Sequence, residues 1–171
     1  MQKAIGIVMV ILAPTLMGFS KTLKLRSKAR FLADLISALG MLRAEICTRL
    51  TPLPDVMEIL SKSAPNSCRT FFAGLHKGLG RLGELSFAEV WEDEVRTLRG
   101  AVLSEEEYEA VNALGTTLGR YDSQEQKTSI DTMIARISLF TDEARAACEV
   151  QGKLWTGLGV AAGIMIAIAI V

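Results

Sequence analysis

Two long apolar runs without any charged side chain lie at the two ends of the chain. Residues 4–19 read AIGIVMVILAPTLMGF and residues 154–171 read LWTGLGVAAGIMIAIAIV. As helices rising about 1.5 Å per residue, runs of this length approach the ~30 Å hydrocarbon core of a bilayer. We predict transmembrane anchors over residues 1–20 and 154–171, with a helical domain over residues 21–153 between them.

The charges that flank the two runs predict their orientation. Basic residues next to a span are retained in the cytoplasm. Lys153 precedes the second run, and five basic residues follow the first before any acid, namely Lys21, Lys24, Arg26, Lys28 and Arg30. We expect the central domain in the cytoplasm, and the first run to be an uncleaved anchor because no clear cleavage site follows it. The basic run could also touch anionic lipid headgroups, but a role in topology is the simpler interpretation.

Small residues and one proline stand inside the apolar runs. Gly159 and Gly163 form a GxxxG pattern, and Gly157 lies one turn nearer the membrane surface. Such residues let helix backbones approach closely in lipid, which would allow a homo-oligomer, although chance in a Gly/Ala-rich span explains the pattern equally well. Pro14 should kink the first span or be covered by a partner.

Apolar residues recur with a seven-residue period in both halves of the central segment. This period predicts a long first helix, ending near Thr51-Pro52, and a long last helix. The first seam is Leu25, Leu32, Leu39 and Ile46 with Leu35 and Leu42 interleaved; the second is Ile130, Met133, Ile137, Phe140, Ala144 and Ala147. One helix leaves the predicted membrane and the other returns to it, so we expect an antiparallel pair.

Shorter helices are expected between the long ones. Proline signals delimit helices near residues 52–63 and 67–82. After them a capping-box pattern occurs three times, in which a short polar side chain and a glutamate satisfy the free amides of a helix start. The three pairs are Ser86 with Glu89, Ser104 with Glu107, and Asp122 with Glu125. The predicted fold is an all-α bundle of about six helices.

The segment LGTTLGRYDSQEQ, residues 114–126, carries two Leu-Gly pairs four residues apart. Leu114 and Leu118 share one helix face, and Gly115 and Gly119 lie on the adjacent face, where they allow close packing. Asp122 is then the N-cap of the last helix. No strand precedes the glycines and no G-K-[ST] follows them, so a phosphate loop is not indicated.

Composition narrows the possible functions. The chain has 19 basic and 19 acidic residues, and a balanced charge argues against a nucleic-acid partner. The three cysteines form no CxxC pair, and the one histidine, His76, has no nucleophile or acid placed near it in sequence. We expect neither an active site, nor a bound metal, nor a cofactor.

Two local features have more than one interpretation. The acids Glu92, Asp93 and Glu94 are expected to form a solvated face, or else a docking surface for a basic partner. The acids at residues 105–109 allow the same two readings. Trp91 stands four residues from both Phe87 and Val95, so it is first a core residue and second a partner contact.

Taken together, several segments resemble the stage III sporulation protein AB family over nearly the whole chain. They include APTLMGF, AEICTRLTPLPDVM, SFAEVWEDEV, LGTTLGRYDSQEQ and the C-terminal apolar run. The most specific positions are Glu45, Thr51, Pro52, Leu53 and Pro54 in one segment, and Leu114, Gly115, Leu118, Gly119, Asp122 and Gln126 in the other. Pro14 departs from the family pattern, where a small polar residue is expected.

The resemblance implies a role that composition does not reveal. Members of this family are similar to the platform proteins of type II secretion systems and act in a channel assembly in the outer forespore membrane, on the mother-cell side. The implied role is a non-enzymatic scaffold that couples a cytoplasmic ATPase, stage III sporulation protein AA, to other channel subunits. The alternatives are a membrane-anchored sensor or regulator, and a membrane-bound enzyme that uses His76 or the acids at 92–94.

Overall fold

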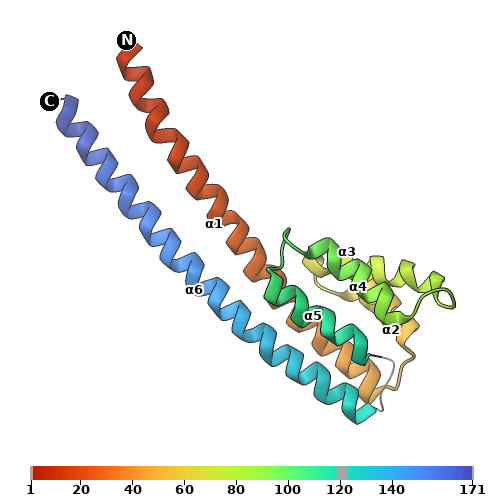
Figure 1. Cartoon of the computed structure of the whole chain (residues 1–171). Coiled ribbons are helices and arrows are strands. Elements are labelled where there is room, and N and C mark those ends of the chain that lie inside the picture. Colours follow the sequence, from red (N-terminus) through yellow and green to blue (C-terminus); the bar gives the residue numbers. More distant parts are fainter. Residues whose placement is uncertain (1, 119–122, 171) are drawn as a thin grey trace. The chain divides into compact units, whose positions relative to one another are not determined.

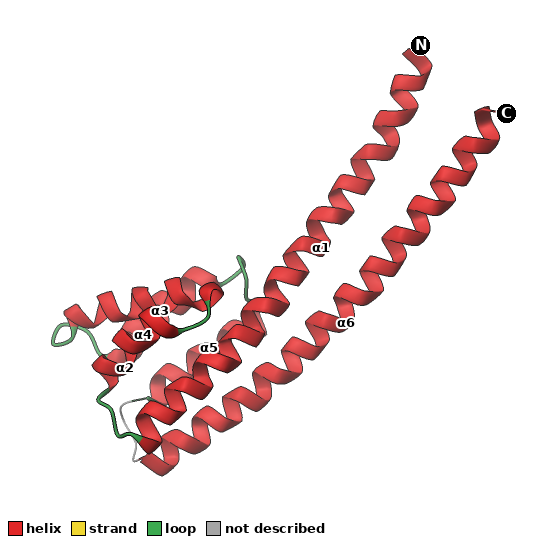
Figure 2. Ribbon diagram, turned by 180° about the vertical axis from the view of Figure 1, so that it is seen from behind, coloured by secondary structure: helices red, strands yellow, loops and turns green. Residues whose placement is uncertain are grey.

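A computed structural model describes the backbone of residues 2–118 and 123–170. It describes side chains between residues 23 and 154, with 119–123, 152 and 153 excepted. The regular elements in these residues are all helical (Figures 1 and 2). They are α1 (Gln2–Arg43), a π-helical turn (Ala44–Thr48), α2 (Leu53–Ser63), α3 (Asn66–Gly78), a 3-10 turn (Leu79–Arg81), α4 (Phe87–Leu98), α5 (Glu105–Thr117) and α6 (Ser123–Ile170). The prediction of an all-α protein with about six helices is confirmed.

The chain divides into two units, and each is described by itself. One comprises Met1–Ser27 and Glu143–Val171, and its described backbone is the start of α1 and the end of α6. The predicted anchors and the predicted packing residues Pro14, Gly157, Gly159 and Gly163 lie in this unit and, apart from Leu154, outside the residues whose side chains are described. Among the described residues, no helix is both long enough and apolar enough to cross a membrane.

The second unit, Lys28–Asp142, is built on an antiparallel pair formed by the later part of α1 and the earlier part of α6 (Figures 1 and 2). Arg43 near the end of α1 forms an ion pair with Asp131 near the start of α6. The two predicted seams are buried here, through Leu32, Leu35, Leu39 and Leu42 on α1 and Ile130, Met133, Ile137 and Phe140 on α6. The predicted pairing of the first and last helices is therefore confirmed within this unit.

The short helices pack through an aromatic cluster. The ring of Phe71 on α3 lies edge-on to Phe72 and to Trp91 on α4, at centroid distances of 5.1 and 5.4 Å. The Trp91 indole N–H donates a hydrogen bond to the Val111 carbonyl of α5 at 3.0 Å, so the buried polar atom of this ring is satisfied. This cluster links α3, α4 and α5 into one layer.

The helix starts follow the predicted capping chemistry. The Ser86 N–H donates to Glu89 at 2.7 Å, and the Glu89 N–H donates to the Ser86 hydroxyl at 3.4 Å. At α5 the Ser104 N–H donates to the Glu107 carboxylate at 2.8 Å. Both boxes were expected from their spacing. The third, at Asp122, falls outside the described residues.

Candidate partner-binding site

The end of α1 changes from α-helical to π-helical hydrogen bonding over Ala44–Thr48. Sequence periodicity predicted a helix to about residue 51 but did not reveal this wider turn. Its last amide, Arg49 N–H, reaches back five residues to the Ala44 carbonyl at 3.1 Å. π-Turns are rare and are frequently found at functional sites, so this turn is the first candidate.

Glu45 closes the turn from within. It is 7% exposed, and its carboxylate accepts from the Arg49 guanidinium at 2.5 Å and from the Thr51 hydroxyl at 3.0 Å. The Glu45 carbonyl also accepts from the Thr51 N–H at 2.9 Å. Two residues that the family resemblance singled out, Glu45 and Thr51, are thus in direct contact. We call residues 45–53 the clasp.

The following two resemblance positions start the next helix. Pro52 is exposed and is the N-cap of α2, and Leu53 is half-buried as its first residue. The Pro52 carbonyl accepts the first α2 bond from Val56 at 3.0 Å. The fixed φ of proline suits this entry into a helix. The clasp is therefore held by hydrogen bonds to the end of α1 on one side and leads directly into α2 on the other.

Leu50 stands at the apex of the clasp and is 72% exposed. Its φ is +54°, in the left-handed region that L side chains seldom adopt. Nothing in the apolar pattern of the sequence indicated this conformation, because glycine or asparagine usually takes the left-handed position after a helix.

The clasp lies beside the start of α6. Burial raises the pKa of the Cys47 thiol above its ordinary value, and the charges of Lys127, Asp131 and Arg43 also act on it. The Arg43–Asp131 ion pair and these charge effects on Cys47 indicate that the end of α1 lies near residues 127–131. The clasp therefore lies near residues 127–131 of α6, which directly follow the second resemblance segment.

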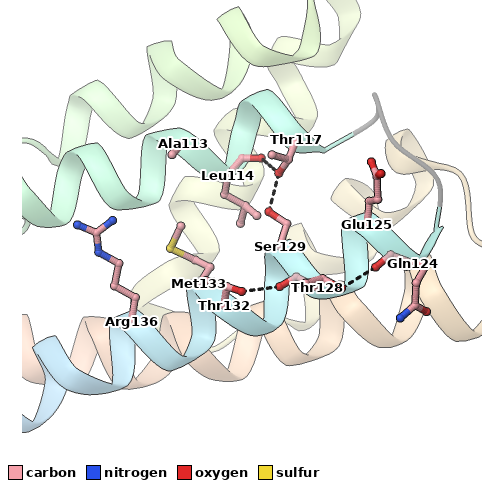
Figure 3. Close-up of a pocket in the computed structure, with 10 residues that line it drawn as sticks. All are labelled: Ala113, Leu114, Thr117, Gln124, Glu125, Thr128, Ser129, Thr132, Met133 and Arg136. Carbon is pink, nitrogen blue, oxygen red and sulfur yellow. Dashed lines mark hydrogen bonds between the residues drawn. The ribbon is translucent and has the colours of Figure 1, made fainter.

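A groove of about 570 Å³ runs between α5 and α6 close to this end (Figure 3). Its lining includes the apolar side chains of Leu114 and Met133 and several hydroxyl groups. Among these, the Thr117 hydroxyl of α5 and the Ser129 hydroxyl of α6 are hydrogen-bonded to one another at 2.9 Å. The remaining lining residues are Ala113, Gln124, Glu125, Thr128, Thr132 and Arg136.

The second resemblance segment contributes mainly to the core next to the groove. Leu114 and Leu118 are 1% and 2% exposed, which confirms the predicted common face. Gln126 is half-buried and engaged with neighbouring groups. Gly119 and Asp122 lie outside the described residues.

Trp91 is fully buried, so of its two expected roles the core role is the one observed. The neighbouring acids differ from one another. The Arg96 guanidinium lies 2.8 Å from Glu92 and 3.6 Å from Asp93, so much of their charge is locally balanced. Glu94 is half-buried over the backbone of Gly74 on α3.

Glu107 corrects the expectation that the acids at residues 105–109 are all solvent-facing. It is 4% exposed and accepts from the Lys28 ammonium at 2.9 Å as well as from the Ser104 amide. The sequence did contain a pattern from which the burial of Lys28 could have been predicted. Lys28 stands seven residues before Leu35 and fourteen before Leu42, so it occupies a position of the buried seam.

The enzymatic alternative named His76 and the acids at 92–94. His76 is exposed on α3. In the part of the chain that the structure describes, no group of three or more His, Cys, Asp or Glu side chains could hold a metal ion.

Comparison with known proteins agrees with the resemblance. The family model for stage III sporulation protein AB matches residues 3–171. The chain is 27% identical over 167 residues to stage III sporulation protein AB of Bacillus subtilis (strain 168), covering 97% of each protein. A solved structure of stage III sporulation protein AB superposes with a TM-score of 0.64 and 25% identity, covering 72% of this chain and 97% of that one. The chain therefore belongs to the stage III sporulation protein AB family.

Proposed function

We propose that this sporulation protein is a membrane-anchored, non-enzymatic scaffold. Apolar segments 1–20 and 154–171 would anchor it, and residues 21–153 would present a helical bundle in the cytoplasm, on the mother-cell side of the outer forespore membrane. The bundle would couple a cytoplasmic ATPase, stage III sporulation protein AA, to other channel subunits.

The observation that carries this proposal is the antiparallel pairing of α1 and α6 in the Lys28–Asp142 unit. Arg43 pairs with Asp131, so the chain enters at Lys28 and leaves at Asp142 on the same side of the unit. Each of these two helices continues into one of the uncharged apolar runs. Two spans reached from the same side suit a domain held against one membrane face.

The clasp is the proposed partner face of this scaffold. It lies at the opposite end of the α1–α6 pair from Lys28, near residues 127–131 of α6. Its Glu45 carboxylate accepts hydrogen bonds from Arg49 and Thr51 within the clasp, and these bonds fix the conformation of the loop. A preformed loop loses little conformational freedom on binding.

The test combines topology with binding. Full-length chain is produced in membranes with a reporter inserted at the exposed Gly83 loop and, separately, with tags at each terminus. The loop reporter should be cytoplasmic and both tags should be on the other side. The detergent-solubilised chain should also co-purify with stage III sporulation protein AA. A loop reporter outside the cytoplasm would overturn the topology, and loss of co-purification would overturn the scaffold role.

A further inference from the structure

Leu50 combines a strained backbone conformation with an exposed apolar side chain. Its φ of +54° is a conformation in which a Cβ crowds the backbone. Among the residues that the structure describes, it is the only non-glycine residue with positive φ. Its side chain is also 72% exposed, the largest exposed fraction among the exposed large apolar residues described. Glycine would fit the backbone better and would lose little buried contact.

We propose that Leu50 is an anchor residue that inserts into an apolar pocket on a protein partner, and that a carboxylate borders this pocket. A strained residue in a fixed loop suggests a functional contact when the fold itself gains nothing from the side chain. A leucine that contributes little to its own core can still contribute binding energy once a partner removes it from water.

The loop around Leu50 is rigid enough to act as such an anchor. The residue before it donates to Ala44, and the residue after it is held to Glu45 through both its N–H and its hydroxyl. Pro52 follows with its φ fixed by the ring. The side chain is therefore presented in one position, and the entropy lost on binding is small.

The charges beside Leu50 indicate the border of the pocket. Both carboxylate oxygens of Glu45 are occupied inside the clasp, by Arg49 and Thr51. The Arg49 side chain remains 70% exposed. A guanidinium has five N–H donors, so Arg49 can bind a partner's carboxylate while it keeps its bond to Glu45.

A lipid surface fits this position less well than a protein does. Leu50 follows the C-terminal end of α1, whereas the uncharged run occupies the start of the same helix. A single leucine flanked by an arginine and a proline also offers little apolar area for insertion into a bilayer. A protein pocket that encloses the side chain recovers more of its exposed area.

This inference rests on the proposed scaffold function and names its contact residue. The probe is purified stage III sporulation protein AA, titrated onto full-length chain in detergent micelles. Leu50→Gly should weaken binding by about tenfold or more, the scale of an anchor residue. Leu50→Met keeps an apolar side chain of similar volume and should bind within about twofold of the unaltered chain. The midpoint of thermal unfolding of Leu50→Gly should equal or exceed that of the parent.

Leu139→Ala is the matched control, because Leu139 is a 64% exposed leucine in ordinary helical conformation on α6. It should bind as the parent does. Equal binding by Leu50→Gly and the parent would overturn this inference and leave the scaffold function standing. No binding by the unaltered chain would overturn both.

Three further results would also contradict the anchor role. One is a loss of affinity in Leu139→Ala as large as that in Leu50→Gly, which would make the effect unspecific. Another is a much lower unfolding midpoint in Leu50→Gly, which would make the leucine structural. The third is a change in self-association, by sedimentation, with ATPase binding unchanged; a second copy would then occupy the site.

Discussion

Gly115 on α5 lies directly against the indole of Trp91 on α4. A Cβ added to Gly115 would stand 2.3 Å from Trp91 Cδ1 and 2.8 Å from Trp91 Cβ. Trp91 is fully buried and its N–H is bound to Val111, so the ring cannot retreat without breaking that bond. The close contact between α4 and α5 thus depends on the absence of a side chain at Gly115.

Gly115→Ala should therefore lower the free energy of unfolding by about 1–3 kcal/mol, the cost of overpacking. Gly74→Ala is the matched control, since the atoms nearest to its new Cβ are the carboxylate end of Glu94, which can swing away. It should change stability by less than about 0.5 kcal/mol. Gly40→Ala, with nothing within 4 Å, should stabilise α1 by about 0.5–1 kcal/mol. Thermal unfolding followed by tryptophan fluorescence distinguishes the three, and equal effects at Gly115 and Gly74 would contradict the packing.

Removing only one partner of the Lys28–Glu107 ion pair should lower the free energy of unfolding more than replacing both. Lys28→Met leaves the buried Glu107 carboxylate with the Ser104 amide as its hydrogen-bond donor, and should cost roughly 2–4 kcal/mol. Glu107→Gln removes the charge but keeps an oxygen for Ser104. The double variant should therefore be more stable than Lys28→Met alone, as measured by urea unfolding of the full chain in detergent. Additive losses would show that the two groups are not coupled.

The capped and periodic parts of the fold could be predicted from the sequence. Ser86 and Ser104 start helices because their side chains and backbone amides pair with a glutamate three residues later, which is a local effect. The seams of α1 and α6 follow from apolar spacing alone. Gly115 could be identified as a close-packing position, although the sequence did not show that Trp91 was its neighbour.

The candidate site was less predictable because it depends on tertiary contacts. Glu45 and Thr51 could be singled out, but their contact requires the π-turn, which has no known local signal in this sequence. The left-handed Leu50 contradicts residue preference, so propensity predicts the wrong conformation there. Lys28 and Glu107 looked like ordinary surface charges because each is polar, and only the heptad position of Lys28 indicated burial.

Glu94 should make stability depend on pH. Partial burial, followed by the charge of Asp93, raises the pKa of Glu94, while Lys77 lowers it. A carboxyl with a raised pKa binds its proton more tightly in the folded state, so its contribution is largest at low pH. That contribution is lost as pH rises from the ordinary glutamate value of about 4.3 through the raised value. Glu94→Gln should unfold at a higher temperature than the parent at pH 7, and the difference should shrink toward pH 4. A difference that grows on acidification would contradict this.

Reversal of Glu92 and Asp93 tests the acidic docking alternative without disturbing packing. Both side chains are about half exposed and share Arg96. Glu92→Lys with Asp93→Lys should cost less than about 1 kcal/mol of stability, as expected for surface pairs. If a basic partner docks there, the association rate with the ATPase should fall several-fold at low salt, and the difference should fade at high salt.

The control for this reversal is Lys24→Glu with Arg26→Glu, two exposed residues of α1 that should leave the rate unchanged. Lys28 is excluded because it belongs to the buried pair with Glu107. A loss of binding in the basic double variant alone would move the docking surface to the middle of α1, around residues 24–26.

The chain enters the unit at Lys28 and leaves it at Asp142 on the same side. This arrangement also affects the conformational entropy of the unfolded chain. If both neighbouring helices are held in a membrane, the unfolded chain between them remains a closed loop rather than a free coil. In the chain-entropy description, closing a loop of roughly 100 residues removes freedom equivalent to about 4–5 kcal/mol. The bilayer would then act as a cross-link without a covalent bond, and the domain would resist unfolding more strongly in place than when its ends are cut free.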